Sequence, residues 1–130
     1  RDVDLKCVIL KTSMAVTGKE NPLKAEAIEV AERTMRALKA SVPDKLAGVV
    51  FLSGGQSPEE ATANLNEIAR LEPAPWPISF SYSRALQEPA LSAWMGKQEN
   101  AADCQAAFMR RLSLVALAQS GGYSSEMEKK

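Results

Sequence analysis

The sequence contains no histidine and only two cysteines, and both shortages restrict the chemistry available to the chain. Without histidine, Ser-His-Asp catalysis, Cys-His catalysis and the usual imidazole metal sites are excluded. Cys7 and Cys104 lie far apart without CxxC spacing, which is typical of a reducing compartment and argues against a disulfide scaffold or a zinc finger. We therefore predict no metal and no cofactor. Lysine, arginine, carboxylates, tyrosine and backbone amides remain as functional groups.

An excess of either charge is also missing, because sixteen basic residues balance sixteen acidic ones. A basic face for nucleic acid or an anionic membrane is therefore not expected. No apolar stretch approaches the roughly 20 residues that span a bilayer. The opening residues RDVDLK lack the apolar region of a signal peptide, and an opening Arg1 instead of methionine leads us to expect further sequence upstream.

Three short apolar runs predict β-strands. They are Leu5–Leu10, Gly48–Leu52 and Ile78–Tyr82. The first two are nearly continuous, which is typical of strands covered on both faces. The third alternates, so Ile78, Phe80 and Tyr82 are predicted to face helices, while Ser79 and Ser81 face inward.

Helical periodicity fills the intervals between these runs. The first predicted helix follows an Asn21-Pro22 start signal and has a stripe of Leu23, Ala27, Ala31, Met35 and Leu38. The second starts with Ser57 as N-cap, Pro58 in the first turn and Glu60 as the capping-box acid, and buries Ala61, Leu65 and Ile68. After the connector Glu72–Pro77, helices are predicted around Ala85–Met95, interrupted or started by Pro89, and from Asn100 to Gln119, closed by Gly121-Gly122.

This alternation predicts an α/β fold with about three parallel strands and flanking helices. The 130 residues suffice for one domain or a piece of one. A complete TIM (β/α)₈ barrel takes about 250 residues, so three units would form part of one. We predict a partial barrel over residues 1–122 and a flexible tail over residues 123–130, with a small open sheet as the alternative.

The turn Ser53-Gly54-Gly55 follows the second strand and has the composition of an anion site. Its glycines permit close backbone approach, and the Ser53 hydroxyl adds a donor. Arg84 follows the third strand and can meet a phosphate with a two-pronged charged contact. An ordinary βα turn and a surface cation are the alternative interpretations. Because barrel phosphate sites commonly use the loops after the last two strands, the pair favours a phosphate cradle.

Lys11 terminates the apolar run CVILK, so its amine is expected at the same rim. An uncharged lysine amine can attack a ketone to form a Schiff base. A solvated lysine at a strand end is the ordinary alternative.

Three segments resemble class I fructose-bisphosphate aldolase. GVVFLSGGQSPEEATANLNEI resembles that family's seventh strand and following helix, and PWPISFSYSRALQEPALSAWMGKQEN resembles its eighth strand and beyond. VILKTSM is similar to the sixth-strand segment that bears the Schiff-base lysine. The likeness runs from about Leu5 to Tyr123.

The resemblance implies metal-free cleavage of fructose 1,6-bisphosphate to dihydroxyacetone phosphate and glyceraldehyde 3-phosphate, as in glycolysis and gluconeogenesis. It also implies a cytoplasmic location, with a plastid as the alternative, and a homotetramer. Lys11 would be the Schiff-base lysine. The phosphate would be held by Leu52, Ser53, Gly54, Ser81 and Arg84.

The chain departs from the family pattern at three places. Ser83 stands where the family normally has glycine, Thr12 and Ser13 replace proline followed by asparagine or serine, and the ending EMEKK replaces a longer tail that ends in tyrosine. In that family the acid/base glutamate comes from a strand before the sixth. We therefore expect activity only with upstream strands. A non-catalytic remnant and a free-standing phosphate-binding module are the alternatives.

Overall fold

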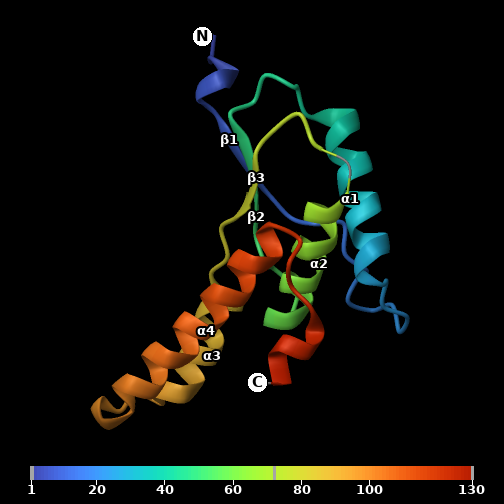
Figure 1. Ribbon diagram of the computed structural model, residues 1–130. Coiled ribbons are helices and arrows are strands. Elements are labelled where there is room, and N and C mark those ends of the chain that lie inside the picture. The colour runs from blue at the N-terminus through green and yellow to red at the C-terminus, as the bar shows by residue number, and fades with distance from the viewer. Residues whose placement is uncertain (1, 72, 130) are drawn as a thin grey trace.

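The computed structural model describes residues 2–71 and 73–129, in which strands and helices alternate (Figure 1). The order is β1 (Ile9–Thr12), α1 (Ala27–Ser41), β2 (Gly48–Phe51), α2 (Pro58–Arg70), β3 (Ile78–Phe80), α3 (Arg84–Trp94) and α4 (Ala101–Gln119). Short 3₁₀ helices occupy Leu5–Cys7, Gln98–Asn100 and Ser125–Lys129. The predicted α/β class with three strands and flanking helices is confirmed.

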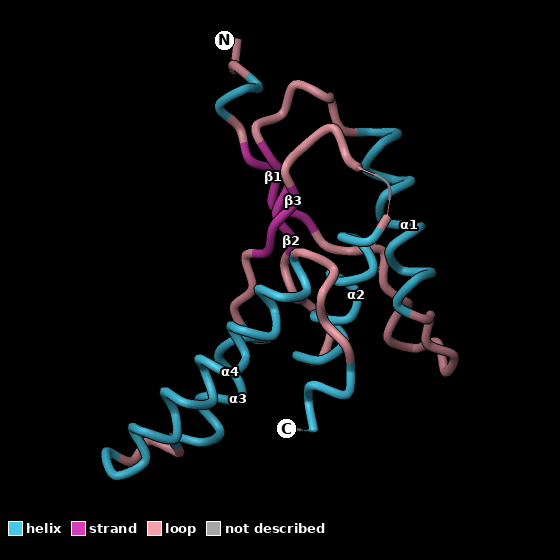
Figure 2. Tube along the Cα trace, in the orientation of Figure 1, coloured by secondary structure: helices cyan, strands magenta, loops and turns pink. Residues whose placement is uncertain are grey.

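The three strands form one parallel sheet in the order β1-β2-β3 (Figure 2). Lys11 pairs with Val50, and Val50 pairs with Ser79. Backbone hydrogen bonds continue the pairing past the strands, because Leu52 N–H donates to Thr12 O at 2.9 Å and Ser81 N–H donates to Phe51 O at 2.8 Å. Since the strands are parallel, their carboxyl ends share one edge of the sheet.

The two faces of the sheet have different surroundings. Val49 and Phe51 are fully buried beneath the helices, where Leu10, Ile78 and Phe80 pack against the same core. By strand alternation the opposite face carries Ile9, Lys11, Val50 and Ser79. Ile9 on that face is 64% exposed. The helix-facing direction of Ile78 and Phe80 is therefore confirmed, and the opposite face is open around Ile9 and Lys11. Ser79 lies on that opposite face, where its Oγ donates to Gln119 Oε1 at the end of α4 at 3.2 Å.

The first strand begins later than the apolar run predicts. Leu5–Cys7 form a 3₁₀ turn because the Asp4 carboxylate accepts from Lys6 N–H at 3.0 Å and Asp4 O accepts from Cys7 N–H at 3.0 Å. Side-chain hydrogen bonds of this kind compete with a sheet ladder. At its other end β1 extends to Thr12, because Lys11 pairs with Val50 and Thr12 pairs with Phe51, so Lys11 lies inside the strand rather than after it.

The Asn21-Pro22 start signal is wrong, because α1 begins at Ala27. Asn21 Oδ1 accepts from Leu23 N–H at 3.0 Å, and Thr17 Oγ1 accepts from Ala25 N–H at 2.9 Å. These bonds give the backbone a local alternative to the helix. Leu23 is 79% exposed and does not belong to the buried stripe.

The later helices match the prediction closely. The capping box of Ser57 and Glu60 is present at the start of α2, and α4 ends before Gly121, which has a φ of 74°. Helix α3 continues through Pro89 instead of breaking there. In the connector, Glu72 lies outside the described residues, and Trp76 Nε1 donates to Pro43 O at 2.8 Å. Within the described part of the chain, no helix is both long and apolar enough to cross a membrane.

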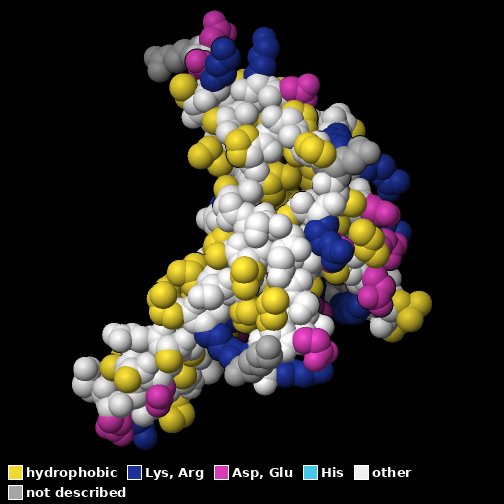
Figure 3. All heavy atoms as spheres, viewed as in Figure 1, with side chains coloured by type: hydrophobic (Ala, Val, Ile, Leu, Met, Phe, Trp, Pro, Cys, Tyr) yellow, Lys and Arg dark blue, Asp and Glu magenta, His cyan; other side chains and the backbone are white. Residues whose placement is uncertain are grey.

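Helices α3 and α4 pack against each other and extend away from the sheet (Figure 1). Apolar side chains remain at their surface, and Figure 3 shows hydrophobic atoms along α4. Leu91 is 55%, Met95 66% and Met109 57% exposed. The described residues therefore leave apolar surface uncovered on this pair as well as on the sheet.

The C-terminal segment packs on α2 and α4, although the sequence predicted a flexible tail from Tyr123. Tyr123 is 7% exposed, its N–H donates to Asn66 Oδ1 at 2.9 Å, and its hydroxyl donates to Glu128 Oε1 at 2.8 Å. Arg111 forms a salt bridge with Glu128 at 2.7 Å. These contacts are not those of a free tail, and the physical reason is the buried ion pair together with the tyrosine ring.

The buried hydrogen bond of Tyr123 predicts a pH dependence for this packing. Burial, followed by the Glu128 carboxylate, raises the pKa of Tyr123 from 10.0 to about 12. Because the folded-state pKa is the higher one, the stabilisation is complete below pH 10 and is lost as the pH approaches 12. Phenolate absorbance of the folded protein, minus that of Tyr123→Phe, should therefore show a midpoint near 12. A midpoint at the ordinary tyrosine value would contradict the packing.

Candidate functional site

Lys11 lies on the open face of the sheet. It is the third residue of β1, and its side chain is exposed. Its partner across the sheet on β2 is Val50, which in turn pairs with Ser79 on β3. The hydrogen bonds beyond the strands place Leu52 and Ser81 two residues further along the same face. Two residues of strand correspond to about 7 Å. The amine of a lysine side chain can span that step, so Lys11 and the carboxyl edge of the sheet can serve one ligand.

The Ser53-Gly54-Gly55 turn connects β2 to α2 and contacts the start of α3. Ser53 is 5% exposed, and its carbonyl accepts from Gln56 N–H at 3.2 Å. Its hydroxyl accepts from Ala85 N–H at 3.4 Å. The ends of β2 and β3 therefore meet at Ser53, even though Ser53 and Ala85 are 32 residues apart.

Arg84 is the first residue of α3 and lies close to this turn. A Cβ built on Gly54 would lie 4.0 Å from Arg84 Nη2 and 2.9 Å from Leu52 Cδ1. The absence of a side chain at residue 54 thus keeps backbone accessible beside the guanidinium. Of the six predicted site residues, Ser53, Gly54 and Arg84 converge directly, while Lys11, Leu52 and Ser81 share the open face of the sheet.

The helix that follows the turn is already capped by its own side chains. Ser57 Oγ accepts from Glu60 N–H at 3.1 Å, and Glu60 Oε2 accepts from Ser57 N–H at 2.8 Å. Ser57 Oγ also donates to Glu59 Oε2 at 2.8 Å. Glu60 therefore acts as the capping-box acid, as predicted, and Glu59 is bonded to the same serine, so both carboxylates are engaged at the start of α2.

Tyr82 positions the end of β3, although the sequence did not mark it as part of the site. Its hydroxyl donates to Ala61 O at 2.8 Å and thereby connects the end of β3 to the first turns of α2. Burial raises the pKa of Tyr82 above its usual range, so the hydroxyl keeps its proton beyond the pH at which an exposed tyrosine loses it. The alternation in ISFSY could have indicated this role, because it predicts that Tyr82 faces the helices.

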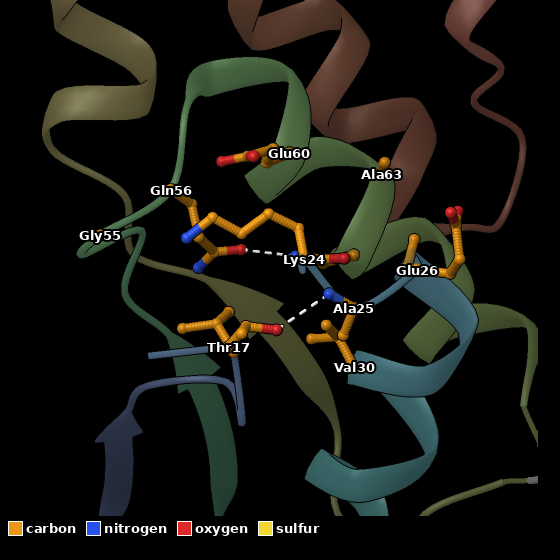
Figure 4. A pocket seen from close by; sticks show the side chains of 12 residues that line it. Thr17, Lys24, Ala25, Glu26, Val30, Gly55, Gln56, Glu60 and Ala63 are labelled. Carbon is orange, nitrogen blue, oxygen red and sulfur yellow. Dashed lines mark hydrogen bonds between the residues drawn. The ribbon is translucent and has the colours of Figure 1, made fainter. Parts of the chain in front are cut away.

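A separate pocket of about 250 Å³ lies between the loop after β1 and the start of α2 (Figure 4). Thr17, Lys24, Gln56 and Glu60 are among its lining residues, and none of the six predicted site residues lines it. Gln56 Oε1 accepts from Asn64 Nδ2 at 2.7 Å across its wall. Arg84 instead lines a groove of about 460 Å³ along α3. No group of three potential metal-binding side chains occurs among residues 2–71 and 73–129.

Comparison with known proteins identifies relatives of the chain. The family model described as "Fructose-bisphosphate aldolase class-I" matches residues 1–130. "Fructose-bisphosphate aldolase C" of Rattus norvegicus is 46% identical over 122 residues, which cover 93% of this chain and 34% of that protein. "Fructose-bisphosphate aldolase 4, cytosolic" of Arabidopsis thaliana is 44% identical over 127 residues, which cover 97% of this chain and 32% of that protein. The chain thus spans about a third of the length of these curated relatives.

A solved structure has the same arrangement of elements. It is a ternary complex of fructose-bisphosphate aldolase from Plasmodium falciparum with TRAP and a small-molecule inhibitor. The TM-score is 0.86 at 45% sequence identity, covering 90% of this chain and 34% of that chain. This likeness confirms the predicted partial (β/α)₈ barrel.

The two glycines of the turn provide a matched pair of substitutions. Gly54→Ala places a methyl group against Leu52 and beside Arg84, so we expect inorganic phosphate to bind about tenfold more weakly, or about 1.4 kcal/mol. Gly55 has a φ of 79° and open space around it. Gly55→Ala should therefore lower the free energy of unfolding by about 1–2 kcal/mol and leave phosphate affinity unchanged.

Titration calorimetry with phosphate and denaturant unfolding separate the two effects. The measurements use this chain joined to upstream barrel strands. Equal phosphate affinity in Gly54→Ala and in the unsubstituted protein would show that the cradle lies elsewhere.

Proposed function

The chain belongs to the class I fructose-bisphosphate aldolase family, and we propose that it supplies the last three strand–helix units of a (β/α)₈ barrel that cleaves fructose 1,6-bisphosphate. The products are dihydroxyacetone phosphate and glyceraldehyde 3-phosphate. One observation carries the proposal. Lys11 lies on the open face of the sheet, and the carboxyl edge beside it bears Ser53, Gly54 and Arg84.

In the proposed reaction, Lys11 is the nucleophile. Its uncharged amine attacks the ketone carbon of the substrate, and loss of water gives an iminium ion. A base takes the proton of the hydroxyl on the carbon two positions from the iminium carbon. The bond between that carbon and the one beside the iminium breaks to release the aldehyde, and its electron pair moves into the iminium as an enamine. Protonation of the enamine and hydrolysis of the imine return the lysine. The base belongs to upstream strands, because Glu59 and Glu60 are engaged at the start of α2.

The phosphate next to the ketone carbon positions the substrate. Arg84 offers a two-pronged charged contact, the turn offers the Ser53 hydroxyl and accessible backbone at Gly54, and Leu52 and Ser81 complete the site on the same face. Holding this phosphate aligns the ketone with Lys11, and such alignment lowers the barrier without a metal or cofactor. The exposed side chains of Lys11 and Arg84 would then be covered by the substrate and the remaining strands.

Location and assembly are part of the same proposal. A cytoplasmic location agrees with the two free cysteines and with a relative named as cytosolic, and a plastid is the alternative. The partner is the sugar bisphosphate. The assembly is a homotetramer, an inference that rests on the resemblance to the family.

Chemical trapping tests the role of Lys11. The chain, joined to upstream barrel strands, is incubated with dihydroxyacetone phosphate and reduced with borohydride. Peptide mass analysis should find the adduct on Lys11, because reduction converts the iminium into a stable amine. Lys11→Met should abolish the adduct, while Lys6→Gln on the neighbouring 3₁₀ turn should retain it. An adduct on another lysine would refute the proposed nucleophile.

A non-catalytic remnant is the second candidate, and Ser83 is the observation that favours it. Ser83 occupies the N-cap of α3 without a side-chain cap, and its hydroxyl donates to Gln87 Oε1 at 3.4 Å. The family that the chain resembles normally has glycine at this position, which directly precedes Arg84. In the chain joined to upstream strands, a Lys11 adduct with Ser83 or with Ser83→Gly would refute the remnant, and the absence of an adduct with both residues would favour it.

A free-standing phosphate-binding module would need a complete surface. The open face and both strand edges of the sheet present apolar side chains and unpaired backbone groups. We therefore expect the isolated chain to associate in a concentration-dependent manner in sedimentation experiments. A monodisperse monomer with a cooperative thermal transition would favour the module and argue against an incomplete barrel.

A further inference from the structure

Helix α4 contains a buried arginine that the proposed reaction does not use. Arg111 is 4% exposed. Its Nη1 donates to both carboxylate oxygens of Glu128, at 2.8 and 2.7 Å. Its Nη2 donates to Thr62 Oγ1 and, at 3.4 Å, to Pro58 O. One guanidinium thus joins α4, the C-terminal segment and the first turns of α2.

The contacts on the α2 side are linked to one another. Thr62 Oγ1 donates to Pro58 O at 2.6 Å and accepts from Arg111, so the two acceptors of Nη2 form one unit. Thr62 is fully buried. The described residues give Arg111 Nε no partner, so Nη1 and Nη2 make all of its hydrogen bonds within the described residues. A buried charge held this way resists displacement, because moving α2 or the tail would leave it uncompensated.

This part of α2 is adjacent to the predicted phosphate site. Pro58 directly follows the N-cap Ser57, and the carbonyl of Ser53 is bonded to the intervening Gln56 N–H. On the other side, Ala61 O accepts from the Tyr82 hydroxyl, which fixes the end of β3. The start of α2 therefore lies between Arg111 on one side and the strand ends that carry the cradle on the other.

We propose that Arg111 is a positioning residue for the phosphate site. It clamps the C-terminal segment and the first turns of α2 together, and this clamp sets the position of the Ser53-Gly54 turn relative to Arg84. The proposal rests on the proposed function of these residues as the phosphate site. Lysine cannot replace the clamp fully, because its single ammonium lacks the planar fork that reaches Glu128 and Thr62 at once.

Neighbouring side chains supply matched variants. Arg110 also contacts the C-terminal segment, since its Nη2 donates to Met127 O at 3.2 Å and Glu128 O at 2.6 Å, but it makes no contact with α2 among the hydrogen bonds of the described residues. Arg110→Met is therefore the control. Arg111→Met and Thr62→Val remove the connection to α2, and Glu128→Gln weakens the connection to the tail. Arg111→Lys tests partial rescue.

The first experiment measures protection of Arg84. In the chain joined to upstream strands, an arginine-modifying dicarbonyl reagent is applied at increasing inorganic phosphate, and modification of Arg84 is followed by mass spectrometry. We expect Arg111→Met and Thr62→Val to need about tenfold more phosphate for half-protection, a change of about 1.4 kcal/mol. Arg111→Lys should be intermediate, and Arg110→Met should match the unsubstituted protein.

The second experiment separates positioning from stability. Steady-state cleavage of fructose 1,6-bisphosphate should show a KM raised about tenfold in Arg111→Met and Thr62→Val, with kcat within about twofold of the unsubstituted enzyme. A lower melting temperature with unchanged KM and unchanged protection would mean that Arg111 only stabilises the fold, and this result would overturn the proposal. If Arg111→Met does not fold, the KM and the Arg84 protection of the isosteric variant Thr62→Val decide between positioning and stability.

The outcomes also separate this inference from the proposed function. Protection of Arg84 by phosphate without cleavage would refute the proposed reaction while leaving the clamp supported by the variants. The absence of phosphate protection in the unsubstituted protein would refute the phosphate site, and the clamp would fail with it.

Discussion

The candidate site depends on the parallel register of three short strands, none of which is longer than four residues. This register pairs Lys11 with Val50 and Val50 with Ser79, so the only lysine of β1 occupies the face that the helices leave open. A shift of one residue would turn that side chain into the core beneath α1 and α2. Leu10 opposes this shift, because its side chain packs against the core that contains Val49 and Phe51 on the opposite face. Packing on one side of the sheet therefore fixes which side chains lie on the other.

The first turns of α2 connect this sheet to the rest of the chain. Their capping box makes the helix begin at Pro58, and their carbonyls receive the Tyr82 hydroxyl from β3 and the Arg111 guanidinium from α4. The Ser53-Gly54-Gly55 turn directly precedes this region, and the Ser53 side chain is tied to the start of α3. Buried hydrogen bonds behind the turn therefore hold the residues of the proposed phosphate site in place.

Local sequence signals predicted the features that depend on neighbouring residues. The capping box at Ser57, the end of α4 at Gly121 and the alternation around Phe80 belong to this group. Local signals could not predict features that depend on competing side-chain hydrogen bonds or on residues far apart in the sequence. The start of α1 is shifted by Asn21 and its neighbours, and the packing of the C-terminal segment depends on Arg111, which pairs with a residue 17 positions later and with α2 49 positions earlier. The expected roles of Lys11 as Schiff-base lysine and of Arg84 as phosphate ligand came from the family resemblance, because the sequence pattern alone also allowed a solvated lysine and a surface arginine.

In the proposed function, the open face and the strand ends beside it carry the nucleophile and one phosphate site. Strand alternation is a property of each βα unit and the glycine turn belongs to the unit of β2, whereas the proposed proton-transfer group comes from upstream strands. The most direct measurement is a crystal structure of this chain joined to upstream strands and soaked with dihydroxyacetone phosphate. The account predicts continuous density from Lys11 Nζ to a phosphate held between Gly54 and Arg84. A phosphate bound away from Arg84, or a Lys11 side chain pointing into the helix-covered face, would contradict it.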